Sequence, residues 1–164
     1  MTTDLNWLPE LVRLDTYNGN WDRYLEAIYK FFSKDFVADQ PTYQGRKLAL
    51  KRLPMYEGKE VTFWHIISEG GSEESRVPNL RRCERIKWPR PIIENCNDPD
   101  IKIWENLRNN EKRICILLDS ADYLVVIARR RDFDLFWTAY PLTWPHQKRK
   151  LIKEYEAYIK ANAA

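Results

Sequence analysis

Apolar side chains in the first forty residues recur every three or four positions, as they do along one face of an α-helix. The stripe consists of Trp21, Tyr24, Leu25, Ile28, Phe32 and Phe36. The segment Asn18–Asn20 precedes it and offers a chain break and a helix cap. A shorter helix is predicted over Leu8–Leu14. Residues 1–40 are therefore expected to form a helical N-terminal arm.

The middle of the chain has shorter periodic segments. Residues 48–52 alternate apolar and charged or small side chains, which predicts a short strand that ends before Pro54. The apolar run over 60–68 fits either a strand or a helix, and both interpretations stay open. Two short helices are predicted next, over 79–86 and 91–96, because prolines interrupt any longer one.

Four strand-like runs dominate the last part of the chain. They cover residues 101–107, 113–118, 123–129 and 134–140. The links between them are short, so neighbouring strands are predicted to pair antiparallel as a meander. Alternation on the last run puts Leu135, Trp137 and Ala139 on one face and Phe136, Thr138 and Tyr140 on the other. A final helix is predicted after Pro145.

These elements predict an α+β fold: N-terminal helices followed by a four-stranded antiparallel meander sheet and a C-terminal helix. The 164 residues, 44% of them hydrophobic, can bury one sizeable core. We expect two parts, the arm over 1–40 and an α+β domain over 41–164. No apolar run approaches the roughly 18 residues of a membrane span, and the first residues do not resemble a signal peptide. A cytoplasmic protein without membrane contact is expected.

Neither a metal nor a nucleotide cofactor is expected. Cys83, Cys96 and Cys115 are an odd number of cysteines at wide spacings, which argues against a disulfide framework and a zinc site. None of the five glycines has the spacing of a phosphate-binding loop, a dinucleotide fingerprint or a nucleophile elbow.

Charge is distributed unevenly. The arm holds four Lys/Arg against seven Asp/Glu, although the whole chain has a formal net charge of +3. Residues 76–92 hold six basic side chains against the single acidic Glu84. The members of this basic block are Arg76, Arg81, Arg82, Arg85, Lys87 and Arg90. Such a density favours a phosphate-bearing partner, and a solvated helix face is the alternative.

His65 is the main candidate for chemistry. It lies in the apolar run over 60–68, where a histidine can be either a proton-transfer group or an ordinary buried side chain. A histidine, several arginines, and Thr138 and Tyr140 on one strand face suit metal-free RNA cleavage. In that reaction a base and an acid move protons while cations and hydroxyl donors stabilise the phosphate charge.

Four segments resemble a phage and prophage family assigned to the barnase, EndoU, colicin and RelE-like (BECR) nuclease group. They are LPMYEGKEVTFWHIISEG, PNLRRCERIKWPRPIIEN, ADYLVVIARRRDFDLFWTAYPL and HQKRKLIKEYEAY. The resemblance spans roughly residues 45–160 and leaves the arm uncovered. It implies helices before a four-stranded antiparallel sheet, in agreement with the pattern above.

The resemblance implies a catalytic set and an RNA-binding set. The catalytic set is His65 as acid or base with Arg85, Thr138 and Tyr140. Together with the basic block, the resemblance leads us to expect an RNA-binding set of Ser68, Glu69, Arg81, Arg82, Lys87 and Trp88. The choice among Arg81, Arg82 and Arg85 for the phosphate contact stays open, and Trp88 can equally be a core residue.

The first functional hypothesis is a metal-independent, toxin-like endoribonuclease of phage or prophage origin, which would need a neutralising protein partner. The alternative is a non-catalytic protein on the same fold that binds RNA or a host protein, in an anti-defence or regulatory role.

Overall fold

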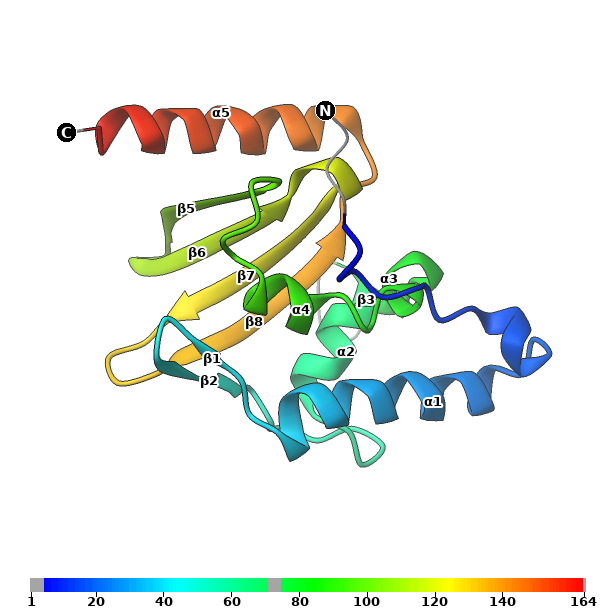
Figure 1. The fold of residues 1–164 in the computed structure, drawn as a ribbon. Coiled ribbons are helices and arrows are strands. Elements are labelled where there is room, and N and C mark those ends of the chain that lie inside the picture. The colour runs from blue at the N-terminus through cyan, green and yellow to red at the C-terminus, as the bar shows by residue number, and fades with distance from the viewer. Residues whose placement is uncertain (1–4, 71–74, 164) are drawn as a thin grey trace.

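The computed structural model describes residues 5–70 and 75–163 and has the predicted α+β composition (Figure 1). Its helices are α1 (Trp21–Ser33), α2 (Val61–Ile67), α3 (Leu80–Glu84), α4 (Pro89–Glu94) and α5 (Pro145–Ala161). Its strands are β1 (Thr42–Tyr43), β2 (Arg46–Leu50), β3 (Ser68–Glu69), β4 (Val77–Pro78), β5 (Ile101–Arg108), β6 (Glu111–Leu118), β7 (Tyr123–Arg129) and β8 (Asp134–Pro141). Short turns of other helix types are η1 (Leu14–Tyr17), the π-helical η2 (Lys34–Ala38) and η3 (Asp119–Ala121).

The main sheet differs from the predicted four-stranded antiparallel meander. It has six strands in the order β1-β2-β8-β7-β6-β5, and it is mixed because β2 pairs parallel with β8. Strands β5 to β8 do pair antiparallel in succession. Strands β3 and β4 form a separate two-stranded sheet. The prediction was incomplete because pairing between residues 46–50 and 134–136 is not encoded in the local pattern of either segment.

The fully buried Asp134 helps to attach β2 to β8. Its Oδ1 accepts hydrogen bonds from Arg46 Nε at 3.2 Å and Arg129 Nε at 2.9 Å. A buried carboxylate needs such partners because its desolvation is costly. Arg46 also donates to the carbonyl oxygen of Arg130 at 2.7 Å, so β2, β7 and β8 are held together at one end of the sheet.

The arm packs against the rest of the chain. The buried face of α1, with Ile28 and Phe32, belongs to the same apolar cluster as Phe63 of α2 and Phe136 of β8. The predicted helix over Leu8–Leu14 is wrong, because this segment is extended up to η1. Backbone and side-chain hydrogen bonds hold it there, including Val12 N–H to the carbonyl oxygen of Glu84 at 2.9 Å.

The sheet buries a different apolar cluster on each face. The first contains Ile116 and Val125 and packs beneath α1, α2 and α4, and the second contains Trp104 and Leu117 and packs beneath α5 (Figure 1). A β-bulge between Val126 and Ile127 interrupts the alternation that was predicted for β8.

Because of the bulge, two residues of β8 lie on other faces than predicted. Phe136 lies in the α1 cluster together with Ala139, instead of sharing a face with Thr138 and Tyr140. Trp137, predicted beside Ala139, lines a cavity with Thr138 and Tyr140. The predicted common face of Thr138 and Tyr140 is confirmed by that cavity.

Helix α5 is anchored at its first turns. Lys148 Nζ lies 2.8 Å from Asp119 Oδ1 and 2.7 Å from Asp122 Oδ1, and it donates to the carbonyl oxygen of Asp119 at 2.9 Å. Lys102 Nζ of β5 lies 2.7 Å from Asp119 Oδ2. These contacts fix α5 to the connection between β6 and β7. None of the helices within residues 5–70 and 75–163 has the length and hydrophobicity needed to cross a membrane.

Candidate functional site

Two arginines hold the C-terminal end of α2. Arg82 Nη1 donates to the carbonyl oxygens of His65 at 3.3 Å and Ser68 at 2.7 Å. Arg76 Nη2 donates to the same two oxygens, at 2.8 and 2.6 Å. The last carbonyl groups of a helix lack intrahelical donors, so these bonds satisfy them. The guanidinium groups therefore fix the segment that carries His65, Ser68 and Glu69.

The predicted site residues on this segment differ in exposure. His65 is half-buried, Ser68 is buried and Glu69 is exposed. Glu69 Oε1 accepts a hydrogen bond from Asn79 Nδ2 at 3.1 Å, and the Asn79 N–H donates to the carbonyl oxygen of Ile67 at 2.7 Å. The side chain of Asn79 also caps α3. The start of α3 is thereby locked to the end of α2.

Arg82 also reaches strand β8. Its guanidinium carbon lies 5.2 Å from the centre of the Tyr140 ring, within the range of a cation–π interaction. Burial raises the pKa of Tyr140 and lowers the pKa of Arg82, whose charge the nearby Arg76 also disfavours. The phenol is neutral at physiological pH and the guanidinium stays charged. Arg82 therefore connects α2 to β8, because it contacts the end of the helix and the Tyr140 ring of the strand directly.

Tyr140 and Thr138 line a cavity of about 220 Å³ between the sheet and α5. The wall is completed by Arg108 and Asn106 of β5, Arg113 of β6 and several apolar side chains. Within the described residues, neither the Thr138 nor the Tyr140 hydroxyl hydrogen-bonds to protein, so both can bind a ligand. The cavity combines two guanidinium groups with two hydroxyl groups, which is a suitable set of donors for a phosphate.

The remaining predicted residues on α3 and beyond lie away from this cavity. Arg81 is exposed, and its carbonyl oxygen accepts from Arg85 Nη1 at 2.9 Å. The Arg85 guanidinium lies over the ring of Trp88, 5.1 Å from its centre. Trp88 is 8% exposed, packs edge-on against Tyr123 and donates Nε1–H to the carbonyl oxygen of Pro9 at 2.9 Å. Trp88 is thus a core residue in this structure.

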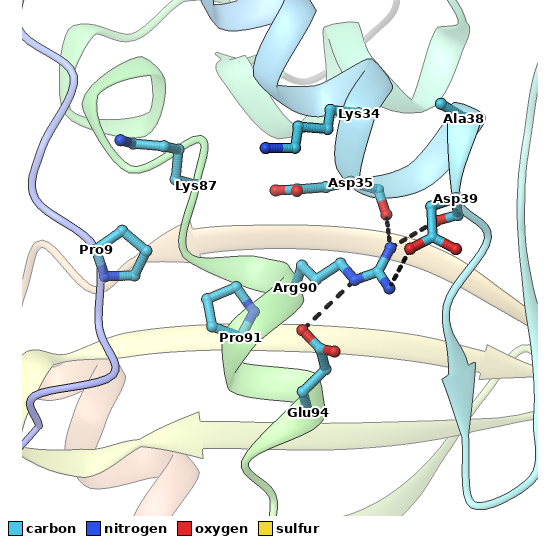
Figure 2. A pocket seen from close by; sticks show the side chains of 9 residues that line it. All are labelled: Pro9, Lys34, Asp35, Ala38, Asp39, Lys87, Arg90, Pro91 and Glu94. Carbon is cyan, nitrogen blue, oxygen red and sulfur yellow. Dashed lines mark hydrogen bonds and ion pairs between the residues drawn. The ribbon is translucent and has the colours of Figure 1, made fainter.

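Lys87 lines a second cavity, of about 430 Å³, between η2, α4 and the N-terminal segment (Figure 2). Arg90 forms its floor: its guanidinium donates to the carbonyl oxygens of Asp35 (2.5 Å) and Asp39 (2.6 Å) and lies 3.5 Å from Glu94 Oε1. Burial raises the pKa of Asp35, against the effect of Arg90. Lys87 and Arg90 of the basic block thus line this second cavity, and no described member of the block lines the first. Most of its arginines bind backbone carbonyl oxygens.

Sequence reasoning missed Asn106, Arg108 and Arg113. Their arrangement follows from the two-residue turn Asn109–Asn110, whose φ values of 52° and 63° are typical of a type I′ hairpin. Such a turn pairs residue 108 with 111 and Asn106 with Arg113, as observed. The sequence predicts a short antiparallel link between these two strands, so this register and the shared face of the three side chains follow once the Asn109–Asn110 turn is identified.

No group of three or more His, Cys, Asp and Glu side chains is placed to hold a metal ion in residues 5–70 and 75–163. Comparison of the chain with family models, curated proteins and solved structures yields no match.

Proposed function

We propose that the protein is a metal-independent endoribonuclease of the toxin-like kind that the family resemblance implies. The contact between Arg82 and Tyr140 is the observation that supports this most, because it joins the helix end carrying His65 to the strand carrying Thr138 and Tyr140. Thr138 and Tyr140 are 56 or more positions away from both Arg82 and His65 in the sequence. Thr138 and Tyr140 also line a cavity with two further arginines, Arg108 and Arg113, and this set of donors supports a phosphate site on chemical grounds.

In the proposed reaction, the ribose 2′-oxygen attacks the adjacent phosphorus and the bond to the 5′-oxygen breaks. A base removes the 2′-hydroxyl proton and an acid protonates the leaving 5′-oxygen, with His65 in one of these roles. Arg82 and the Thr138 and Tyr140 hydroxyl groups stabilise the charge on the phosphate oxygens. The products are a 2′,3′-cyclic phosphate and a 5′-hydroxyl end, and no water needs activation in this step.

The test is incubation of the purified protein with bulk cellular RNA, with and without excess chelator, followed by analysis of the product ends. The proposal predicts cleavage in chelator with cyclic or 3′-phosphate ends. Products with 3′-hydroxyl ends, or cleavage that stops in chelator, would show a different mechanism.

A second candidate is a non-catalytic protein that binds RNA or a host protein. The observation that favours it is that the basic block stabilises the fold: Arg76, Arg82, Arg85 and Arg90 all donate to backbone carbonyl oxygens. Guanidinium groups that stabilise the fold leave fewer cations for a catalytic phosphate clamp. RNA binding without any cleavage, by protein with a normal melting curve, would favour this candidate.

A further inference from the structure

The cavity between the sheet and α5 contains guanidinium donors that the fold does not use. Arg108 is exposed and forms no hydrogen bond or ion pair within the described part of the chain. Arg113 donates Nε–H to Glu111 Oε1 at 2.7 Å and lies 4.1 Å from the centre of the Trp137 ring. Its terminal nitrogens donate to no described residue. No acidic residue among those that the structure describes lines the cavity, so an anionic group is the ligand that these cations favour.

Asn106, a residue of the cavity wall, has one unsatisfied acceptor that the protein covers. Asn106 Nδ2 donates to Glu154 Oε1 at 2.5 Å, whereas Asn106 Oδ1 is buried and has no hydrogen-bond partner in the described residues. The orientation of this amide is determined by its neighbour, because the opposite orientation would place Oδ1 against the carboxylate of Glu154. A buried acceptor without a partner is costly, so a ligand that brings a donor to Asn106 gains affinity.

We propose that this cavity binds one ribose-phosphate unit of RNA and recognises its 2′-hydroxyl. Arg108 and Arg113 hold the phosphate, and on binding the cavity wall shifts enough for the covered Asn106 Oδ1 to accept the hydrogen bond from the 2′-hydroxyl. This inference rests on the proposed function: Thr138 and Tyr140 contact the cleaved phosphate, and Asn106, Arg108 and Arg113 of the same cavity hold the neighbouring nucleotide. The volume of about 220 Å³ is below that of pockets that enclose whole drug-sized ligands, so the base lies outside.

Discrimination against DNA follows from the chemistry of the acceptor. A deoxyribose in the cavity would bring no donor, and Asn106 Oδ1 would stay unpaired. A 2′-fluoro sugar also lacks a hydrogen-bond donor at this position, although it keeps an RNA-like shape. The preference for a 2′-hydroxyl is therefore expected to depend on Asn106, and the overall affinity on Arg108.

Fluorescence anisotropy with matched single-stranded oligonucleotides tests this, with the His65→Ala protein as the parent so that RNA is not consumed. The parent is expected to bind RNA about 2- to 13-fold more tightly than 2′-fluoro RNA, the effect of one net hydrogen bond. Asn106→Leu should remove that preference. Arg108→Gln should weaken both ligands equally and lower the slope of log affinity against log salt by about 0.7. Arg131→Gln, on an exposed loop, is the matched control and should leave the preference unchanged.

Equal affinity of the parent for RNA and 2′-fluoro RNA would overturn the subsite, even if the wild type cleaves RNA. A preference that persists in a natively melting Asn106→Leu protein would overturn it as well. Titration of unaltered, 15N-labelled protein with ribose 5-phosphate separates this inference from the nuclease proposal. A shift of the Asn106 side-chain amide signals supports the subsite even if no RNA is cleaved, and unshifted signals contradict it.

Discussion

The paired hydrogen bonds at the end of α2 predict that Arg76 and Arg82 substitute for one another in stability. Arg82→Met removes two charge-assisted hydrogen bonds and one cation–π contact, but Arg76 still donates to the carbonyl oxygens of His65 and Ser68. Each carbonyl oxygen keeps one donor, so the loss of unfolding free energy from the hydrogen bonds is about 1.5 kcal/mol, the low end of the range for hydrogen bonds to charged groups. The contact with Tyr140 adds roughly 0.5–1 kcal/mol. The expected loss of unfolding free energy is about 2–2.5 kcal/mol.

The double variant Arg76→Met/Arg82→Met should be worse than the sum of its parts. It removes both arginine donors from the His65 and Ser68 carbonyl oxygens, and the loss of the last donor to a buried acceptor costs about 1–3 kcal/mol. Urea unfolding of the wild type, both single variants and the double variant measures the coupling, for which we expect about 1–3 kcal/mol. Arg81→Met, an exposed arginine on the same helix, should change the free energy by less than about 0.5 kcal/mol. Additive single effects would refute the shared-acceptor account.

Three further predictions concern the rest of the fold. Burial alone would raise the pKa of Asp119, but hydrogen bonds from Lys102 and Lys148 lower it. The stability from this depressed pKa is present above the unfolded value of about 3.9 and is lost as pH falls below it. Asp119→Asn should flatten that part of the pH dependence of urea unfolding, and an unchanged profile would contradict the assignment. Burial raises the pKa of Cys83 and Cys115 to about 12 and that of the half-buried Cys96 to about 11. Thiol reagents at pH 8 should therefore label Cys83 and Cys115 only as fast as the protein unfolds, and Cys96 more slowly than a free thiol. Rapid labelling of Cys83 or Cys115 in native protein would contradict their burial. Asp134→Asn removes the carboxylate that Arg46 and Arg129 share, and it should lower the free energy of unfolding by about 3 kcal/mol. This is the low end for a broken buried ion pair, because both arginines are partly exposed. A loss below roughly 1 kcal/mol would contradict the role of Asp134 in attaching β2.

The sequence predicts the strands well where polar turns bound an alternating run. The strand over 123–129 is observed with the predicted limits, since Asp122 takes a left-handed conformation directly before it. The sequence does not decide between strand and helix for the segment that forms α2, because five of its seven residues are apolar and show no distinguishing period. The parallel pairing of β2 with β8 depends on side chains such as Arg46 and Asp134, which are 88 positions apart.

The site was predictable only in part, for similar reasons. Local patterns identified His65, Thr138 and Tyr140, but the bulge at Trp137 changed which neighbours the last strand presents to the cavity. The density of arginines in the basic block predicted phosphate contacts, whereas the structure shows several of them bound to backbone carbonyl oxygens. A count of charges cannot tell a free guanidinium from one that caps a helix, because that depends on tertiary contacts.

The most direct test of the proposed nuclease compares RNA cleavage in chelator by the wild type, His65→Ala and Tyr140→Phe, each normalised to the folded fraction from its melting curve. The proposal predicts cleavage by the wild type and a loss of about 10²- to 10⁴-fold in His65→Ala, the usual contribution of a positioned acid or base, with a near-native melting curve. Tyr140→Phe keeps the ring against Arg82 and should lose activity through the missing hydroxyl alone. A destabilised His65→Ala protein with undiminished cleavage per folded molecule, or a folded wild type that cleaves no RNA, would contradict the proposal.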